Sequence, residues 1–323
     1  MSYLQAIVIA LVQGVTELFP VSSLGHSVLL PAWLGGSWET MVEQSSQPNS
    51  ESSFYLAYIV ALHVATAIAL LVFFRADWVR IIAGFFRSAA RSIRERRLIA
   101  ADSDERLAWL IVFATIPVGL TGLAFEHTLR TIFAKPLSAA VLLTINGLIL
   151  LAGERLRRRV AATAEQQRVP AEAYATTRSG PRAGEEVTAA VESDQRLAGL
   201  RYRDGVYVGL WQIPALLAGI SRSGATMVGG LTRGLSHEDA ARFAFLLATP
   251  VILAAGVLKL PSLAGPAGDN IHGQVIVGMI VAGVAAYLSV RFLVRYFETR
   301  TLTPFAIYCL VAGIASIIRF GVS

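Results

Sequence analysis

The chain has 323 residues, of which 54% are hydrophobic and 15% are charged, and its formal net charge is +6. Soluble domains usually carry about a quarter charged residues, so the composition excludes an ordinary soluble enzyme and indicates an all-α polytopic membrane protein. The basic residues lie between apolar segments, where membrane topology explains them, so we expect no nucleic-acid partner. The single cysteine, Cys309, excludes an internal disulfide and any multi-cysteine metal site.

The first apolar segment, residues 3–19, is too short to cross a membrane. As a helix it reaches about 25 Å at 1.5 Å per residue, whereas the hydrocarbon core is about 30 Å thick. Pro20 then disfavours continuation of the helix, and a polar break at 22–25 precedes a second apolar run at 28–34. Non-helical backbone at membrane depth must be buried in protein or line a wet cavity. The pattern therefore predicts a re-entrant helical hairpin.

A second broken segment lies late in the chain. Residues 205–217 are apolar but contain Pro214, residues 218–226 are small or polar, and a short apolar run continues to Leu235. This pattern predicts a second re-entrant hairpin. Six other apolar segments are predicted to span the membrane as helices: 54–74, 107–124, 137–153, 241–260, 275–290 and 304–318.

The basic residues orient the chain, because cytoplasmic loops carry an excess of Lys and Arg. Three basic segments are predicted to be cytoplasmic: 75–106, 154–203 and 291–303. Three segments with few basic residues are predicted to be outside: 35–53, 125–136 and 261–273. The middle of 75–106 could form an amphipathic helix on the membrane surface, and 154–203 reads as a long solvent loop, partly helical or disordered. The two hairpins then enter from opposite sides.

The two halves also share a weak sequence similarity. Three pairs of residues align at one common offset: Gln13 with Gln212, Ser22 with Ser221, and Gly25 with Gly224. Together with the opposed orientation, they predict an inverted-topology repeat with its site at the broken helices. The expected organisation is one integral membrane domain over 1–323, made of a first repeat, a charged cytoplasmic loop and a second repeat: 1–153, 154–203 and 204–323. Because secondary transporters often have this design, transport stays open as an alternative function.

Glu17 is the strongest single signal in the sequence. A charged residue at mid-membrane costs about 2.5–3.5 kcal/mol on insertion scales and usually has a partner or a role. It could hold a divalent cation or act as a general acid or base. Gln13 lies four residues before it, on the same helix face, although an amide there is more often a packing or hydrogen-bonding group. The alternative for Glu17 is a carboxylate hydrogen-bonded to backbone near the interface.

Two clusters of polar residues flank the breaks. Ser22, Ser23 and His26 follow Pro20, and the histidine could exchange a proton with a serine hydroxyl, although serines in such turns often cap backbone and a lone histidine is often structural. Arg222 presents a fork of donors suited to phosphate oxygens, or else extends to the cytoplasmic surface. Ser221, Ser223 and Thr226 add hydroxyls, and Gly224 lets backbone N–H groups approach an anion. A helix expected to begin near Thr226 would add its positive end. His63 and Asn146 are predicted to be structural.

These stretches resemble the undecaprenyl pyrophosphate phosphatase family, also called the BacA or bacitracin-resistance family. The resemblance rests on QGVTE at 13–17, PVSSLGH at 20–26 and AGISRSGAT at 218–226. The runs FAFLLATPVILAAG at 243–256 and PFAIY at 304–308 also look like the family. Ala218 stands where the family usually has Pro, and the loops 36–53 and 160–200 look longer than usual, with no assigned role.

The resemblance implies hydrolysis of undecaprenyl diphosphate to undecaprenyl phosphate and inorganic phosphate, which recycles the lipid carrier for peptidoglycan and confers bacitracin resistance. It implies a multi-pass protein of the bacterial inner membrane with its site toward the periplasm. It also implies dependence on a divalent cation, Mg²⁺ or Ca²⁺, which Glu17 would hold with help from Gln13. The expected partners are the lipid substrate and the bilayer, with a homodimer as an open alternative.

The mechanism expected on this basis places the diphosphate where the two breaks converge. Arg222, helped by hydroxyls of both breaks including Ser22, would hold the phosphates. Ser23 is the candidate nucleophile, with His26 as base or acid, and direct attack by water is the alternative. Two other classes of function remain open: a transporter that flips a prenyl phosphate, and an interaction protein that works through 154–203.

Overall fold

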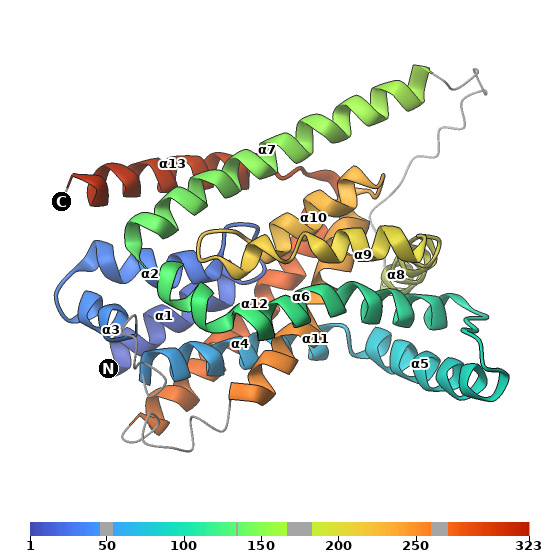
Figure 1. Cartoon of the computed structure of the whole chain (residues 1–323), viewed down its shortest axis with the longest axis horizontal. Coiled ribbons are helices and arrows are strands. Elements are labelled where there is room, and N and C mark those ends of the chain that lie inside the picture. The colour runs from blue at the N-terminus through green and yellow to red at the C-terminus, as the bar shows by residue number, and fades with distance from the viewer. Residues whose placement is uncertain (46–53, 134, 167–182, 260–270, 323) are drawn as a thin grey trace.

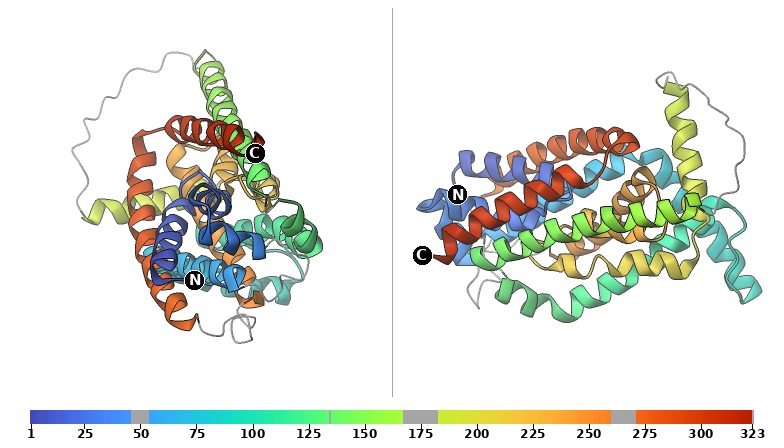
Figure 2. Two further views of the ribbon diagram at one scale, coloured as in Figure 1. Left: turned by 90° about the vertical axis from the view of Figure 1, so that its left-hand side faces the viewer. Right: turned by 90° about the horizontal axis from the view of Figure 1, so that it is seen from above.

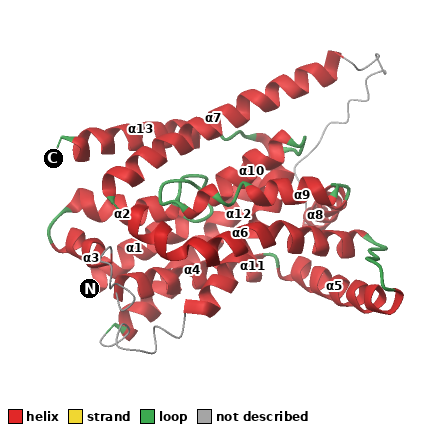
Figure 3. Ribbon diagram, viewed as in Figure 1, coloured by secondary structure: helices red, strands yellow, loops and turns green. Residues whose placement is uncertain are grey.

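The computed structural model describes residues 1–45, 54–133, 135–166, 183–259 and 271–322, and these form helices joined by short turns (Figure 3). The helices, in chain order, are α1 (Tyr3–Thr16), α2 (Ser23–Leu34), α3 (Ser37–Ser45), α4 (Phe54–Phe73), α5 (Arg75–Glu95), α6 (Ser103–Phe133), α7 (Pro136–Gln166), α8 (Ala183–Ala198), α9 (Tyr202–Leu210), the short 3-10 helix η2 (Pro214–Leu216), α10 (Arg222–Thr232), α11 (His237–Lys259), α12 (His272–Thr299) and α13 (Thr303–Gly321).

Six of the described helices are long and apolar enough to cross a membrane: α4, α6, α7, α11, α12 and α13. They coincide with the six predicted spans. The first helix, α1, is apolar but has 14 residues, too few for a span. The predicted class, an all-α polytopic membrane protein, is therefore confirmed.

The spanning helices extend beyond the apolar windows that predict them. The predicted loop 125–136 is mostly helical, because α6 continues to Phe133 and α7 begins at Pro136. The segment contains no glycine, and its one proline lies at a first helical position, where proline is tolerated. The predicted outer loop 35–53 likewise contains α3, while residues 46–53 lie outside the described part of the chain.

The charged segment 154–203 is not a free solvent loop. Helix α7 continues through it to Gln166, and α8 packs against the bundle, with residues 167–182 outside the described part. Asp194 of α8 is 1% exposed and accepts from Arg242 and from Arg80, each at 2.8 Å. Arg196 donates to Asp239 at 2.8 Å. These ion pairs hold α8 to α5 and α11, so this part of the expected loop is a docked helix.

A basic helix is present within 75–106, as expected, although α5 begins at Arg75 rather than in the middle of the segment, and its place on a membrane surface stays a prediction. Its position defines one end of the molecule. Both chain termini lie at one end of the long axis, and α5 and α8 lie at the other (Figures 1 and 2). The pair α1–α2 lies toward the terminal end, while α9 runs inward from the end that holds α8 (Figure 1). The two broken segments therefore approach the middle of the molecule from opposite ends.

Candidate active site

The site is built where the two breaks in the helices touch. Ser22, in the first break, accepts hydrogen bonds from the backbone N–H of Gly25 at 3.2 Å and of Gly219, in the second break, at 3.1 Å. Gly219 has a φ of +117°, and a Cβ on Gly25 would lie 3.0 Å from the Gly219 Cα. Two glycines therefore let the two backbones cross in contact.

Ser22 itself has a φ of +70°, which costs a residue with a side chain about 1–3 kcal/mol. Its hydroxyl offsets this cost by accepting from both breaks. Ser221, its partner in the weak internal repeat, caps α10 in the same way and accepts from Gly224 N–H at 3.1 Å. The aligned serines thus perform the same job in each break, as N-caps.

Asn146 of α7 joins the two breaks from the side. Its side chain donates to the carbonyl of Pro20 at 3.1 Å and accepts from the N–H of Ser221 at 3.0 Å. Asn146 is fully buried, and it is the close partner of both backbone groups, with the thiol of Cys309 a further, longer contact of the Pro20 carbonyl at 3.8 Å. Asn146 is structural, as the sequence predicts, and it fixes the separation of the loops.

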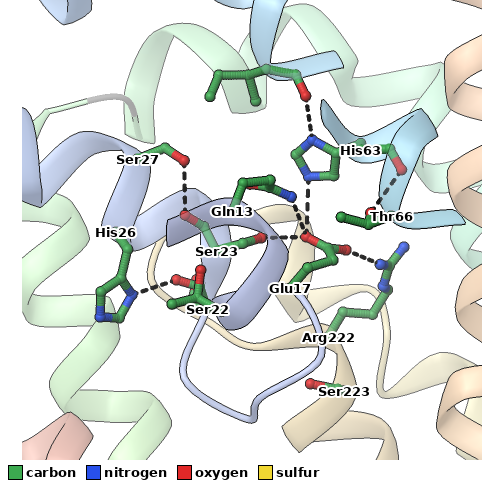
Figure 4. A network of polar contacts seen from close by, with 12 residues as sticks. Gln13, Glu17, Ser22, Ser23, His26, Ser27, His63, Thr66, Arg222 and Ser223 are labelled. Atoms are coloured by element: carbon green, nitrogen blue, oxygen red, sulfur yellow. Dashed lines mark hydrogen bonds and ion pairs between the residues drawn. The ribbon is translucent and has the colours of Figure 1, made fainter. Parts of the chain in front are cut away.

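Glu17 lies at the centre of the polar network, directly after α1 (Figure 4). Its Oε2 accepts from Gln13 Nε2 at 2.8 Å and from Ser23 Oγ at 2.5 Å, and His63 Nε2 lies 3.3 Å away. Its Oε1 accepts from Nη2 of Arg222 in an ion pair. The carboxylate is buried, and these partners supply the hydrogen bonds that a buried charge requires.

Two cations flank this carboxylate. Arg222 is the first residue of α10, and its guanidinium reaches across to Glu17. His63 of α4 has its Nδ1 2.8 Å from the carbonyl of Ile59 and its Nε2 toward Glu17. Carbonyl and carboxylate oxygens only accept, so with Glu17 ionised beside Arg222 this geometry fits protons on both ring nitrogens, which is the imidazolium form. The site therefore combines one buried negative charge with two positive charges.

The other hydroxyls of the second break face backbone. Thr226 donates to the carbonyl of Arg222 at 2.7 Å, and Ser223 donates to the carbonyl of Phe19 at 3.2 Å. Ser221 lies 3.4 Å from that same carbonyl. These residues are predicted to bind phosphate; in the structure the hydroxyls of Ser221 and Ser223 contact the first break, and that of Thr226 returns to its own helix. Helix α10 also begins at Arg222 rather than near Thr226, so its positive end lies at the arginine.

His26 does not meet the expected serine. Its Nδ1 lies 2.7 Å from the carbonyl of Ser22 and its Nε2 lies 2.7 Å from the hydroxyl of Tyr308, in α13. The carbonyl accepts, so Nδ1 carries the proton and Nε2 accepts from Tyr308. The ring points away from Glu17 (Figure 4). The hydroxyl of Ser23 is thus paired with Glu17 and not with His26.

The donor set suits a hard divalent cation that takes most of its ligands from substrate and water. Because a carboxylate only accepts, Gln13 must turn its NH₂ toward Glu17, and its Oε1 is left buried without a protein partner. Among the described residues, no cluster of three or more His, Cys, Asp or Glu side chains could hold a metal by itself. Any metal here would depend on phosphate oxygens for part of its shell.

Two residues of this network escape the sequence reasoning. His63 is the ionisable residue of the α4 span, and the rule that singles out Glu17 applies to it equally. Tyr308 ends the PFAIY run that looks like the family, but nothing in the sequence points to its contact with His26. Its contact with His26, 282 residues away, depends on the packing of α13 beside α2.

The fold and the site together define a polytopic helical membrane protein with a buried carboxylate, guanidinium, imidazolium and serine between two broken helices. The chain belongs to the bacitracin resistance protein BacA family, whose model matches residues 6–315. It is 59% identical to undecaprenyl-diphosphatase 2 of Frankia alni, over 100% of this chain and 99% of the relative. It is also 59% identical to the undecaprenyl-diphosphatase of Mycolicibacterium paratuberculosis, over 98% and 97% of the two chains. A more distant relative, undecaprenyl-diphosphatase 2 of Chromobacterium violaceum, is 38% identical over 98% of this chain and 99% of its own length.

Proposed function

We propose that the protein is a membrane phosphatase that hydrolyses undecaprenyl diphosphate to undecaprenyl phosphate and inorganic phosphate. The observation that carries the proposal is the Glu17–Arg222 ion pair with Ser23 hydrogen-bonded to the same carboxylate. An arginine, whose donors suit phosphate oxygens, close to a serine hydroxyl supports a phosphoryl-transfer site. The names of the relatives, given above, support the same reaction.

The biological setting follows from this reaction. Release of undecaprenyl phosphate recycles the lipid carrier used for peptidoglycan, and removal of the diphosphate confers resistance to bacitracin. We place the protein in the bacterial inner membrane with its site toward the periplasm. A homodimer stays a prediction.

The arrangement of the broken helices supports re-entrant hairpins and an inverted repeat. The pair α1–α2 approaches from the end with the chain termini, and α9 enters from the end with α5 and α8 (Figure 1). Under the positive-inside rule the arginine-rich α5 end is cytoplasmic. The first broken segment, α1–α2, would then enter from the outside. The second, which begins with α9, would enter from the inside, and the shared site would lie between the two.

In the proposed mechanism Arg222 transfers its contact from Glu17 to the terminal phosphate. Before substrate binds, two cations hold the carboxylate ionised and oppose its taking a proton. Once the diphosphate neutralises Arg222, Glu17 becomes a better acceptor for the proton of Ser23, 2.5 Å away. Binding of the correct anion therefore activates the nucleophile.

The bonds then change in two steps. Ser23 Oγ attacks the terminal phosphorus as its proton passes to Glu17, and the bond to the bridging oxygen breaks, so that undecaprenyl phosphate leaves. Water then attacks the phosphoserine, the bond from phosphorus to Ser23 Oγ breaks as Oγ takes its proton back from Glu17, and inorganic phosphate leaves. Arg222 and the N-terminus of α10 offset the negative charge that develops on the phosphoryl oxygens. Direct attack by water on the diphosphate is the alternative.

We assign His26 to the second step, as the base for water. Its Nε2 carries a lone pair that now accepts from Tyr308, and it lies three residues after Ser23 on α2. This role requires the ring to turn from Tyr308 toward Ser23. In the present geometry the Tyr308 contact holds it away.

A divalent cation would be held by Glu17 and the unpartnered Oε1 of Gln13. When bound, such a cation neutralises charge on the phosphate oxygens and so favours attack by a nucleophile. Mg²⁺ and Ca²⁺ are the candidates because the donors are all oxygens.

The function is tested by phosphate release from undecaprenyl diphosphate by the purified protein in detergent, without any membrane gradient. The proposal predicts release that stops on addition of a chelator and returns with Mg²⁺ or Ca²⁺. A transporter on the same scaffold would release no phosphate. Release that a chelator leaves unchanged would remove the cation from the account while keeping the hydrolysis.

A further inference from the structure

A groove of about 590 Å³ runs along the outer surface between α1 and α12. Its size lies within the range of ligand sites in proteins, about 300–1,000 Å³. On the α1 side it is lined by Leu11, Val15 and Phe19, and on the α12 side by side chains that include Val284 and Leu288. The lining carries no charged side chain, so the groove suits an apolar ligand.

Close packing of the two helices forms the groove. A Cβ on Gly14 of α1 would lie 2.5 Å from the carbonyl of Ala282 and 2.7 Å from the Cβ of Ala285. Small residues therefore bring the helix backbones together, and the larger side chains on either side rise above this line of contact. Leu11 and Val15, like Val284 and Leu288, are four residues apart, so each pair forms a row along its helix.

The groove leads to the candidate active site. Phe19 lines its end, and its ring stacks on Phe292 of α12 with centroids 5.9 Å apart. The carbonyl of the same Phe19 accepts from Ser223, beside Arg222. Phe19 is two residues from Glu17, so one residue belongs both to the apolar groove and to the polar loops.

The groove opens to the surroundings of the membrane-spanning helix α12. Val284 and Leu288 are more than half exposed on this helix. An exposed apolar side chain on a spanning helix faces lipid, so a ligand in the groove lies within the bilayer. A hydrocarbon chain fits this position, whereas a soluble partner could not reach it.

We propose that this groove binds the prenyl chain of the substrate, with the diphosphate end of the lipid at Phe19. The proposal rests on the proposed function. It commits the chain to the α1–α12 face rather than to the other lipid-facing surfaces of the protein. The groove then selects long prenyl chains, because a short chain fills only the part near Phe19.

Bulky substitutions in the groove test the proposal with two substrates of different chain length. Val284→Trp and Leu288→Trp narrow the groove, and Val311→Trp places the same bulk on an exposed position of α13, away from it. KM is measured for undecaprenyl diphosphate and for dimethylallyl diphosphate, whose single isoprene unit is too short to pass from Phe292 to Leu288 and Val284, about 6 and 12 Å along α12. We expect the two groove variants to raise KM for the long substrate about 5-fold or more and to leave KM for the short substrate within about 2-fold, while Val311→Trp changes neither; a 5-fold effect corresponds to about 1 kcal/mol.

The outcomes separate the groove from the reaction. Hydrolysis of the short substrate shows that a variant is folded. If a tryptophan variant does not hydrolyse the short substrate, Val284→Phe is measured in its place. Equal changes for both substrates, or none, would show that the groove holds ordinary bilayer lipid only, and the assignment would fail. If the unmodified protein hydrolyses neither substrate, the proposed function fails, and the groove assignment with it.

Discussion

Glu17 and Arg222 lie 205 residues apart in the chain and form an ion pair in which the carboxylate is buried and the guanidinium is partly buried. Each lies beside a break in a helix: Glu17 directly follows α1, and Arg222 begins α10. Neither break could place its charge inside a membrane alone without a large cost. The pairing therefore explains both why the two loops must meet and where a phosphate could displace one partner.

Arg222→Lys keeps the positive charge and removes the planar fork. We expect kcat/KM for phosphate release to fall by about 100-fold or more, because loss of a donor that stabilises developing charge typically costs about 10²–10³. Arg233→Lys is the control, because Arg233 follows α10 and pairs with Asp204 rather than with Glu17. Its guanidinium carbon lies 3.8 Å from the centroid of the Tyr207 ring. Near-normal release by Arg222→Lys would contradict the phosphate clamp.

Ser23→Ala removes the proposed nucleophile. Phosphate release should become undetectable if the phosphoserine is obligatory. Ser27→Ala is the matched control, because Ser27 lies one turn later in α2 and donates to the carbonyl of Ser23 at 3.0 Å; its activity should stay within several-fold of the unmodified protein. If Ser23→Ala keeps activity, the covalent route is wrong and attack by water is preferred.

His63→Gln keeps one N–H donor toward Glu17 and removes the charge. A hydrogen bond to a charged group contributes about 1.5–3 kcal/mol, and roughly half of this is lost when the donor becomes neutral, so kcat/KM should fall about 3- to 10-fold. His272→Gln, at the exposed start of α12, should change nothing. Full activity of His63→Gln would make this residue structural after all.

His26→Ala separates the two chemical steps. If His26 is the base for water, the phosphoserine should accumulate, giving a burst of undecaprenyl phosphate without equivalent phosphate release. Tyr308→Phe, which removes the hydroxyl that holds Nε2, should not accumulate it. The measurement is mass spectrometry of the protein during turnover. A His26→Ala protein that is slow but carries no phosphate would rule out this assignment.

Asn146→Leu leaves the N–H of Ser221 and the carbonyl of Pro20 without this partner. A buried polar group left unsatisfied costs about 1–3 kcal/mol, so the thermal midpoint in detergent should fall by several degrees. Thr144→Val on the same helix removes a hydroxyl that only returns to its own helix, at Ala140, and should change the midpoint little. An unchanged midpoint in Asn146→Leu would mean that the loops do not depend on this clamp.

The sequence predicts the spans well because each depends on its own run of apolar residues. It also predicts the two broken helices, since Pro20 and the serines that follow act on neighbouring backbone. The docking of α8 could not be predicted, because Asp194 finds its partners on α5 and α11, far along the chain. For the same reason composition alone suggested a solvent loop there.

In the candidate site, too, the sequence predicts what a residue's own surroundings determine and misses what distant helices supply. Glu17 and Arg222 stand out because charge is costly in a membrane, and the structure brings them together. The expected contact between Ser23 and His26 is absent in this geometry, because spacing on one helix cannot show which neighbouring element supplies a hydrogen bond. Their catalytic roles stay predictions. Ser23 donates to Glu17, and His63 of α4 joins Ser23 at the same carboxylate. His26 contacts Tyr308 of α13.

The central claim is that Glu17 and Arg222 act together on one diphosphate. A double-mutant cycle of Glu17→Asp, Arg222→Lys and the combined variant, read as kcat/KM for undecaprenyl diphosphate, tests it most directly. Residues that act as a unit should lose little more activity together than the worse single variant loses. Losses that multiply in full would show that the two charges work independently and would contradict the account.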